Sequence, residues 1–374
     1  MRQLLLMLLL LFSAASVKAQ IVIGGSVYGG ARQADVKGST YVHIGADHHD
    51  VLITAVYGGN DISGTVGSSD EMPFEPEVNP DGEGTKVVDK TFNAFVHIDS
   101  TQGELDADKH KLFIGKVFGG GNGAYDYKSE KLEDETTPNP YYNKSLPELA
   151  KAYLQINGGT IGQTFGGGNN ATVTSATVLC IDNQSDVVKS ITDDGTETGT
   201  ELLTDELIDK MGLNSVQTNL EGDFQFARVF GGNNFADMVI RPTWFLKKGK
   251  IRDLYSGGNE GRMTCPQGLL MEINADKPDA VTTDPDVLWI GNVFGGCRKS
   301  DVRPLKDGQD VPNSDIILTP NPNKIPSGFA ARTRVLAGWV ENVYGGNDIS
   351  GNVYGGNTIG IFTTIHGNVY GGGN

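Results

Sequence analysis

Residues 56–64 read VYGGNDISG, and residues 343–351 repeat the same nine letters. Two identical stretches so far apart indicate that the chain grew by duplication of a structural unit. The shared phrase is a Val, Leu or Thr, then Tyr or Phe, then Gly-Gly (once Ser-Gly-Gly), most often closing on Asn. Its ten copies begin at Val27, Val56, Val117, Thr164, Val229, Leu254, Val293, Val343, Val353 and Val369.

Each copy of the phrase predicts a short strand that runs into a corner. Glycine accepts positive φ without steric cost and Asn tolerates it better than most residues, so we expect the bend at the paired glycines. Side chains alternate along a strand, which places the aliphatic residue inward and the aromatic residue outward or over the corner. These aromatic repeat residues are Tyr28, Tyr57, Phe118, Phe165, Phe230, Tyr255, Phe294, Tyr344, Tyr354 and Tyr370.

A second pattern accompanies the phrase at residues 41–44, 95–98, 153–156, 178–181 and 270–273. Each segment alternates apolar and other residues and ends at Gly, Asp or Asn, which predicts another strand followed by a turn. In the first of them Val42 and Ile44 are expected inward and His43 outward. The aromatic residues Tyr41, Phe95 and Tyr153 share one position and predict an aromatic stripe, either open for binding or covered by corners and inserted loops.

The repeat spacing favours an all-β fold, a parallel β-helix (β-solenoid). The intervals from Val27 to Val56, from Val229 to Leu254 and from Val343 to Val369 are 29, 25 and 26 residues, which fit one coil of stacked strands. Val353 divides the last interval, which places the phrase on two sides of one coil. A β-propeller is the alternative, because the mean spacing is near that of a blade. One or two short helices are expected, at 145–148 and around 202–211.

The N-terminus predicts export. Residues 1–19 combine Arg2, an apolar run and small residues before Gln20, which is typical of a signal peptide cleaved near Ala19. Residues 20–374 are then one repeat domain with insertions near 68–90, 126–149, 185–224 and 299–327. Because the chain ends inside a copy of the phrase, we expect a piece of a longer protein, with end-to-end association through an open last coil as the alternative.

Composition restricts the partners. Loss of Arg2 and Lys18 with the signal takes the net charge from −16 to −18, so neither nucleic acid nor an anionic membrane is expected as a partner. No membrane insertion is expected either, since the apolar run near the N-terminus is too short to span a bilayer. The three cysteines Cys180, Cys265 and Cys297 leave two readings open, which are free thiols or a bridge between Cys265 and Cys297.

Metal and catalytic motifs are weak. His43 and His97 occupy the same position of successive coils, yet zinc requires three or four ligands, so we interpret them as surface residues. An isolated calcium on Asp61 or Asp348 is the other metal candidate, and otherwise no cofactor is expected. The fragments nearest to polysaccharide-cleaving chemistry, Asp193-Asp194, residues 332–334 and His366, are scattered, so no catalytic residue is predicted.

The VYGGN and VFGGGN repeats behind an export signal resemble the large glycine-rich repeat proteins that Bacteroidetes export to the cell surface. The resemblance implies a secreted or surface-displayed solenoid with an adhesive or structural role. An extracellular glycan or protein is the candidate ligand. We therefore predict a non-enzymatic adhesin or scaffold. The alternative is a polysaccharide-active enzyme or a carbohydrate-binding module on the same fold.

Overall fold

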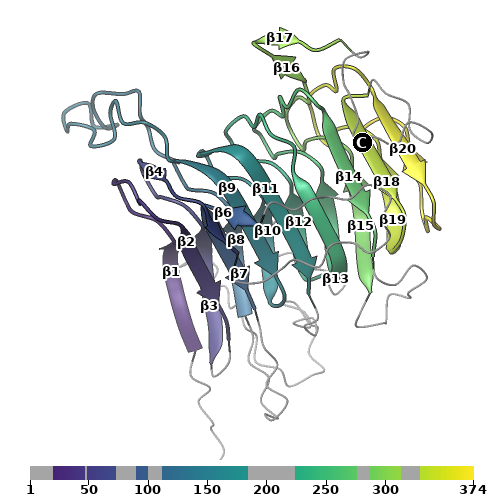
Figure 1. Ribbon diagram of the computed structural model, residues 1–374, viewed down its shortest axis with the longest axis horizontal. Coiled ribbons are helices and arrows are strands. Elements are labelled where there is room, and N and C mark those ends of the chain that lie inside the picture. The colour runs from purple at the N-terminus through teal and green to yellow at the C-terminus, as the bar shows by residue number, and fades with distance from the viewer. Residues whose placement is uncertain are drawn as a thin grey trace, which may run out of the picture.

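The computed structural model describes residues 20–46, 49–72, 90–99, 112–183, 224–275, 287–312 and 329–374. In these residues the chain is all-β, and its coils stack side by side in chain order (Figure 1). The predicted parallel β-helix is confirmed. The propeller alternative is wrong, because strands from successive copies of the phrase pair in parallel.

The strands that carry the phrase form one parallel wall, called here the first wall. In spatial order they are β1 (Gln20–Tyr28), β3 (Asp50–Tyr57), β8 (Leu112–Phe118), β10 (Thr160–Phe165), β12 (Phe226–Phe230), the second half of β13 (Thr243–Tyr255), β15 (Leu288–Phe294), β19 (Trp339–Tyr344) and β21 (Val369–Tyr370). Nine of the ten phrases share one register, from Val27 opposite Val56 to Val343 opposite Val369.

The second pattern forms the second wall. Its strands are β2 (Thr40–Ile44), β7 (Ala94–Ile98), β9 (Glu148–Ile156), β11 (Thr172–Asp182) and the first half of β13, followed by β14 (Leu269–Ile273), β18 (Ala331–Val335) and β20 (Asn357–Ile361). β13 belongs to both walls, because Gly249 at its middle adopts φ 127° and lets one strand pass from the second wall into the next coil of the first.

The tenth phrase lies on a third side of the stack. Val353 pairs with Val302, which continues the short ladder from Met238 and Met263. Tyr354 was expected in the row of phrase aromatics, but it does not stack with them. Its ring is exposed and lies under the guanidinium of Arg303. The prediction that the phrase occupies two sides of one coil is confirmed.

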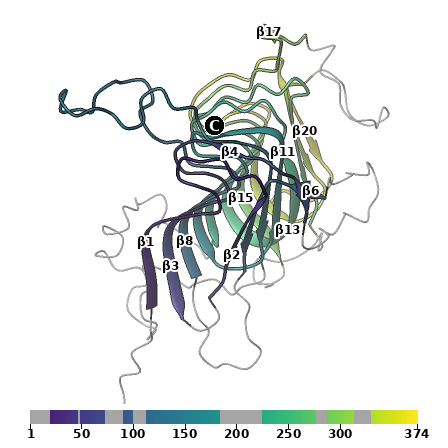
Figure 2. The ribbon, with the colours of Figure 1, turned by 60° about the vertical axis from the view of Figure 1, so that its left-hand side comes forward.

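Four short strands make small excursions, and one two-residue strand extends the stack. β5 (Asp70–Glu71) pairs with β6 (Thr91–Phe92), and β16 (Leu305–Lys306) pairs with β17 (Gln309–Asp310), both antiparallel. β4 (Thr65–Val66) pairs in parallel with β9. Residues 125–147 project far from the stack (Figure 2). No helix forms at 145–148, where Glu148 opens β9 instead, and the helix expected around 202–211 lies outside the described residues.

The core is a continuous aliphatic interior between the two walls. The inward residues of the phrase, such as Val56, Val117 and Val343, are fully buried, and Val42 and Ile44 of the second wall pack against the same cluster. The expected inward direction of the aliphatic residues is therefore confirmed.

The paired glycines serve a different purpose from the one expected. None of the described Gly-Gly pairs of the first-wall phrases has positive φ, which appears instead at Gly64 and Gly351, where each nine-residue phrase ends. A Cβ on Gly167 would overlap the side-chain oxygen of Asn233 from the next coil, and Gly296 stands in the same relation to Asn347. The glycines are thus required by close contact between coils, not by a left-handed bend.

The aromatic residues of the phrase form a second, separate core. Their rings stack face to face from Tyr28 to Tyr370 with centroids 4.6–5.0 Å apart. They do point away from the aliphatic core, but Phe118, Phe165 and Phe230 are fully buried. The second-wall stripe is similar, because Phe95 and Tyr153 are buried with Met72 and Phe92, whereas Tyr41 is exposed. The aromatic stripes are mainly structural.

Candidate functional site

The corner beside the aromatic ladder carries one polar position per coil. It is the fifth residue after the first residue of the phrase, called here the corner row. Along the stack it reads Arg32, Asp61, Asn122, Asn169, Asn234, Asn259, Arg298, Asp348 and Asn374. Side chains in this row meet because the coils are in register, so residues 25 to 65 positions apart become hydrogen-bonding partners.

Four asparagines of the corner row form a directed chain of hydrogen bonds. The amide nitrogen of Asn259 donates to Asn234 (2.7 Å), Asn234 to Asn169 (2.8 Å) and Asn169 to Asn122 (2.9 Å). At one end Arg298 Nη1 donates to Asn259 Oδ1 (3.2 Å), and at the other Asn122 donates to Asp61 (2.9 Å). A guanidinium only donates and a carboxylate only accepts, so the two ends fix the orientation of every amide between them.

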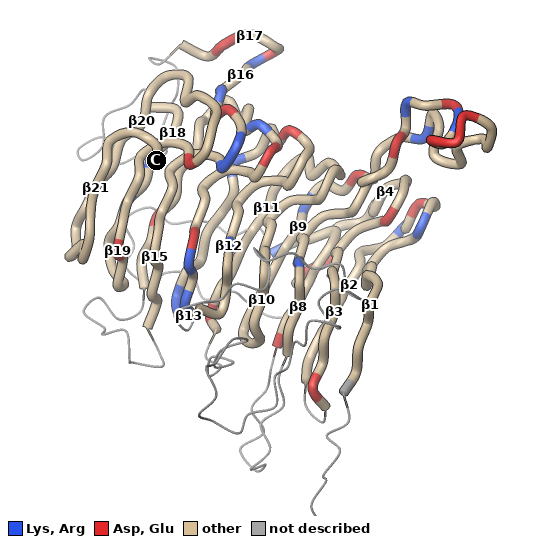
Figure 3. The backbone as a smooth tube through the Cα atoms, turned by 180° about the vertical axis from the view of Figure 1, so that it is seen from behind, with Lys and Arg blue, Asp and Glu red and all other residues tan. Residues whose placement is uncertain are grey.

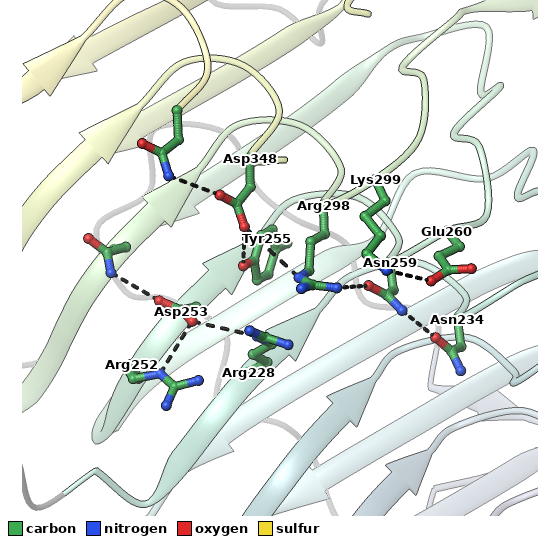
Figure 4. A network of polar contacts seen from close by, with 12 residues as sticks. Arg228, Asn234, Arg252, Asp253, Tyr255, Asn259, Glu260, Arg298, Lys299 and Asp348 are labelled. Carbon is green, nitrogen blue, oxygen red and sulfur yellow. Dashed lines mark hydrogen bonds and ion pairs between the residues drawn. The ribbon is translucent and has the colours of Figure 1, made fainter. Parts of the chain in front are cut away.

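A cluster of charged residues lies where the corner row meets the outer face of the first wall (Figure 4). The hydroxyl of Tyr255 donates to Asp348 Oδ2 at 2.8 Å, and Arg298 Nε lies 4.0 Å from the same oxygen. Beside it, Asp253 lies 3.6 Å from Arg228 and 3.3 Å from Arg252. The residues just before each phrase are also linked by hydrogen bonds. Asn292 donates to Asp253 (2.9 Å), and Asn342 of the next coil donates to Asn292 (3.1 Å).

The electrostatics of this cluster keep its tyrosine protonated. Burial, together with the negative charges of Asp253 and Asp348, raises the pKa of Tyr255 well above its ordinary value. Burial also lowers the pKa of Arg228. Because Tyr255 keeps its proton and donates a hydrogen bond to Asp348, it is a poor general base. The contacts described here join coils to each other.

The two calcium candidates occupy equivalent corner positions but have different partners. Asp61 accepts from Asn122 and from the hydroxyl of Tyr125 (2.7 Å), whereas Asp348 accepts from Tyr255 and Asn374. Across the ranges that the structure describes, no group of three or more His, Cys, Asp or Glu is arranged to hold a metal ion.

The two histidine candidates are neighbours, as expected from their shared position. The rings of His43 and His97 stack with centroids 4.8 Å apart, and His97 Nε2 lies 3.1 Å from Asn157 Oδ1. Burial lowers the pKa of His97, and the charge of His43 acts in the same direction. The pair extends the outward row of the second wall.

The remaining sequence candidates are distributed over several parts of the molecule. Asp193-Asp194 lies outside the described residues. Arg334 of β18 bonds to Glu272, while His366 stacks on Trp339 at 4.4 Å on the first wall. The three cysteines are buried free thiols, so Cys265 and Cys297 are not bridged.

The sequence analysis did not predict a group of aromatic side chains on the outer face of the first wall. Trp289 and Trp339 occupy equivalent positions on the outer face of the first wall, with ring centroids 5.4 Å apart, and Phe224 and His366 flank them at 4.7 and 4.4 Å. Both tryptophans are partly exposed. They could have been found by alignment of the phrases, since each precedes its Val by four residues. The corner row has the same kind of signal.

A comparison of the chain with protein families, with curated proteins and with solved structures finds no match in any of the three. The described residues contain no helix long and apolar enough to cross a membrane.

Proposed function

We propose that the protein is a secreted or cell-surface repeat protein that acts as a non-enzymatic adhesin or structural scaffold. The observation that carries the proposal is the corner network: its carboxylates, amides and guanidinium group bond to one another from coil to coil, so they stabilise a stiff stack. Export rests on residues 1–19, and the adhesive role on the resemblance of the repeats.

The excursion at 125–147 is the part best placed to be presented by such a scaffold. It projects from one side of the stack and carries both acidic and basic residues, including the acidic run at residues 133–135 (Figure 3). Its base is held firmly, because Tyr125 bonds to Asp61 and the hydroxyl of Tyr127 donates to the backbone oxygen of Ile62 at 2.6 Å. Asn139 joins the two sides of the excursion, because its amide donates to the backbone oxygens of Asp126 and Ser129.

Two assays test this proposal together. In cells that express the full chain, surface labelling and N-terminal sequencing are expected to find the protein outside the cytoplasm with Gln20 as its first residue. The purified chain 20–374 is expected to release no reducing sugar from acidic polysaccharides. Turnover that disappears in Asp348→Asn, but persists in the exposed control Asp134→Asn, would instead establish an enzyme.

One observation favours carbohydrate binding as a second candidate function. Trp289, Trp339 and His366 present partly exposed rings beside the amides of Asn292 and Asn342, a combination that suits stacking on a sugar and bonding to its hydroxyls. On a glycan array, Trp339→Ala is expected to lose any signal of the native chain, whereas Tyr354→Ala, an exposed aromatic on the third side, is expected to keep it. Equal signals in both variants would exclude a carbohydrate site at Trp289, Trp339 and His366.

A further inference from the structure

A buried arginine without hydrogen-bond partners for its terminal nitrogens lies on the second wall. Along β18, Val335 packs in the aliphatic core and Thr333 lies on the same side of the strand, so Arg332 and Arg334 take the opposite face. In the paired strands, Arg334 lies opposite Glu272 and bonds to its carboxylate. Arg332 lies between Leu270 and Thr358, neither of which carries a charge.

The environment of Arg332 is costly for a positive charge. The residue is 1% exposed, and within the described part of the chain neither Nη1 nor Nη2 has a hydrogen-bond partner. Its Nε donates to the backbone oxygen of Phe329 at 3.4 Å. A buried ion without a partner costs several kcal/mol, so a well-folded coil is expected to supply a counter-charge.

The guanidinium of Arg241 adds a second positive charge that bears on Arg332. Arg241, just before β13, also has a buried Nη1 without a hydrogen-bond partner. Burial, and after it the charge of Arg241, lowers the pKa of Arg332 to about 9, while Glu272 acts in the opposite direction. Arg332 is therefore still protonated at neutral pH. Among the residues that the structure describes, the charges that bear on Arg332 are the positive charge of Arg241 and the carboxylate of Glu272, and Glu272 already bonds to Arg334.

We propose that Arg332 forms a binding site for one small oxyanion, which accepts hydrogen bonds from its unpartnered terminal nitrogens, and that the positive charge of Arg241 also attracts the ion. A guanidinium presents two parallel N–H groups that match two oxygens of a sulfate, a phosphate or a carboxylate. Because Arg332 is almost completely buried, the ligand is a small ion or a single carboxylate group enclosed by the coil. This site goes beyond the proposed scaffold role and does not depend on it.

The test is titration of the mature protein in Tris-chloride, first freed of oxyanions by dialysis. Sulfate, phosphate and acetate are added separately at constant ionic strength, with chloride as the monatomic control, and binding is followed by calorimetry and by the thermal midpoint. At least one oxyanion is expected to bind with one site per chain and to raise the midpoint by about 2 °C or more near saturation. Which oxyanion binds most tightly distinguishes an inorganic ion from a carboxylate.

Variants locate the site. Arg332→Met is expected to weaken binding at least tenfold and, without oxyanion, to unfold at a midpoint no lower than that of the native chain, because it removes an uncompensated buried charge. The control Arg262→Met changes an exposed arginine paired with Asp237 and is expected to leave binding unchanged. Absence of saturable binding to the native chain, or undiminished binding in Arg332→Met, would overturn the proposal.

If Arg332→Met does not fold, Arg332→Lys and Arg241→Met carry the test. The lysine keeps the positive charge but lacks the planar fork, so binding is expected to weaken at least tenfold while the fold is retained. Arg241→Met removes the second positive charge and is expected to weaken binding in the same direction. Native affinity in both variants would contradict the proposed site.

Discussion

The two identical stretches, 56–64 and 343–351, share their backbone and differ in what surrounds them. In both copies the asparagine makes the same contacts: Asn60 Oδ1 accepts from the backbone nitrogen of Ala31, and Asn347 Oδ1 accepts from that of Cys297. Both copies also end on a left-handed glycine, with φ 92° at Gly64 and 91° at Gly351. The nine residues thus determine the corner itself.

Burial, in contrast, is decided by the neighbours of each copy. Ile62 is completely buried, and its backbone oxygen accepts a bond from Tyr127 of the excursion at 125–147, whereas the equivalent Ile349 is 56% exposed. Each of the two aspartates accepts from an amide and a phenol, but Asp348 also has Arg298 Nε at 4.0 Å. Identical local sequence therefore gives identical geometry and different energetics, which mutations at matched positions can measure.

The largest difference is expected between the two isoleucines. Ile62→Ala removes a buried side chain and is expected to lower the free energy of unfolding by about 4 kcal/mol, while Ile349→Ala is expected to change it by less than about 0.5 kcal/mol. Urea unfolding of both variants measures the difference. Equal losses would show that the excursion does not bury the first copy.

The two asparagines are expected to behave alike. Asn60→Ala and Asn347→Ala each leave a backbone N–H of the preceding coil without its acceptor, at a cost of about 3 kcal/mol when the other side-chain bonds are included. The same urea experiment serves, with Asn374→Ala, an exposed corner residue, as the control. A loss in only one copy would contradict the common geometry of the corners.

A smaller difference is expected between the aspartates. Both bonds to Asp61 reach the same oxygen, which Asp61→Asn can keep, so we expect a loss below about 0.5 kcal/mol. Asp348 uses both oxygens, and Asp348→Asn also removes the charge facing Arg298, so about 2 kcal/mol is expected to be lost. Chemical unfolding at pH 7 tests the order, and a larger loss for Asp61→Asn would contradict it.

The smallest effect is a pH dependence of the phrase tyrosines. Burial raises the pKa of Tyr57 and Tyr344, so the fold favours their protonated forms. This stability is complete below the ordinary tyrosine pKa of about 10 and is lost as the pH rises above it. Tyr57→Phe is expected to recover about 1 kcal/mol of the loss at pH 11, and the more exposed Tyr344→Phe less. Unfolding at pH 8 and pH 11 gives both values, and equal recovery would contradict the difference in burial.

Much of the architecture could be predicted from the phrase alone. Repetition of a β-branched residue at coil-length intervals is sufficient to stack Val27 on Val56 and Val293 on Val343, and the second pattern stacks His43 on His97 in the same way. The purpose of the glycines could not be predicted from the sequence. A side chain at Gly167 is excluded by Asn233 of the next coil, and this depends on how closely the coils approach.

The candidate site was less accessible to sequence reasoning. Its residues lie at a constant offset in each phrase, but Asn259 and Asn234 are ordinary turn residues until the register is known. The helix expected at 145–148 does not form. Glu148 pairs with Thr65 and Thr172 of neighbouring strands, and this pairing outweighs the local preference for a helix. Arg332 and Arg241 are far apart in sequence and carry no motif, so only the packed coils bring them together.

Cysteine cross-linking tests the stacked register most directly. Asn292 and Asn342 are paired residues of adjacent parallel strands, whose separation suits a disulfide, whereas Asn292 and Asn368 are two coils apart. In the doubly substituted chains, Asn292→Cys with Asn342→Cys is expected to form a disulfide under mild oxidation, detected by mass spectrometry of the tryptic digest, and Asn292→Cys with Asn368→Cys is expected to form none. A bridge in the second pair, or in neither, would contradict the parallel stack.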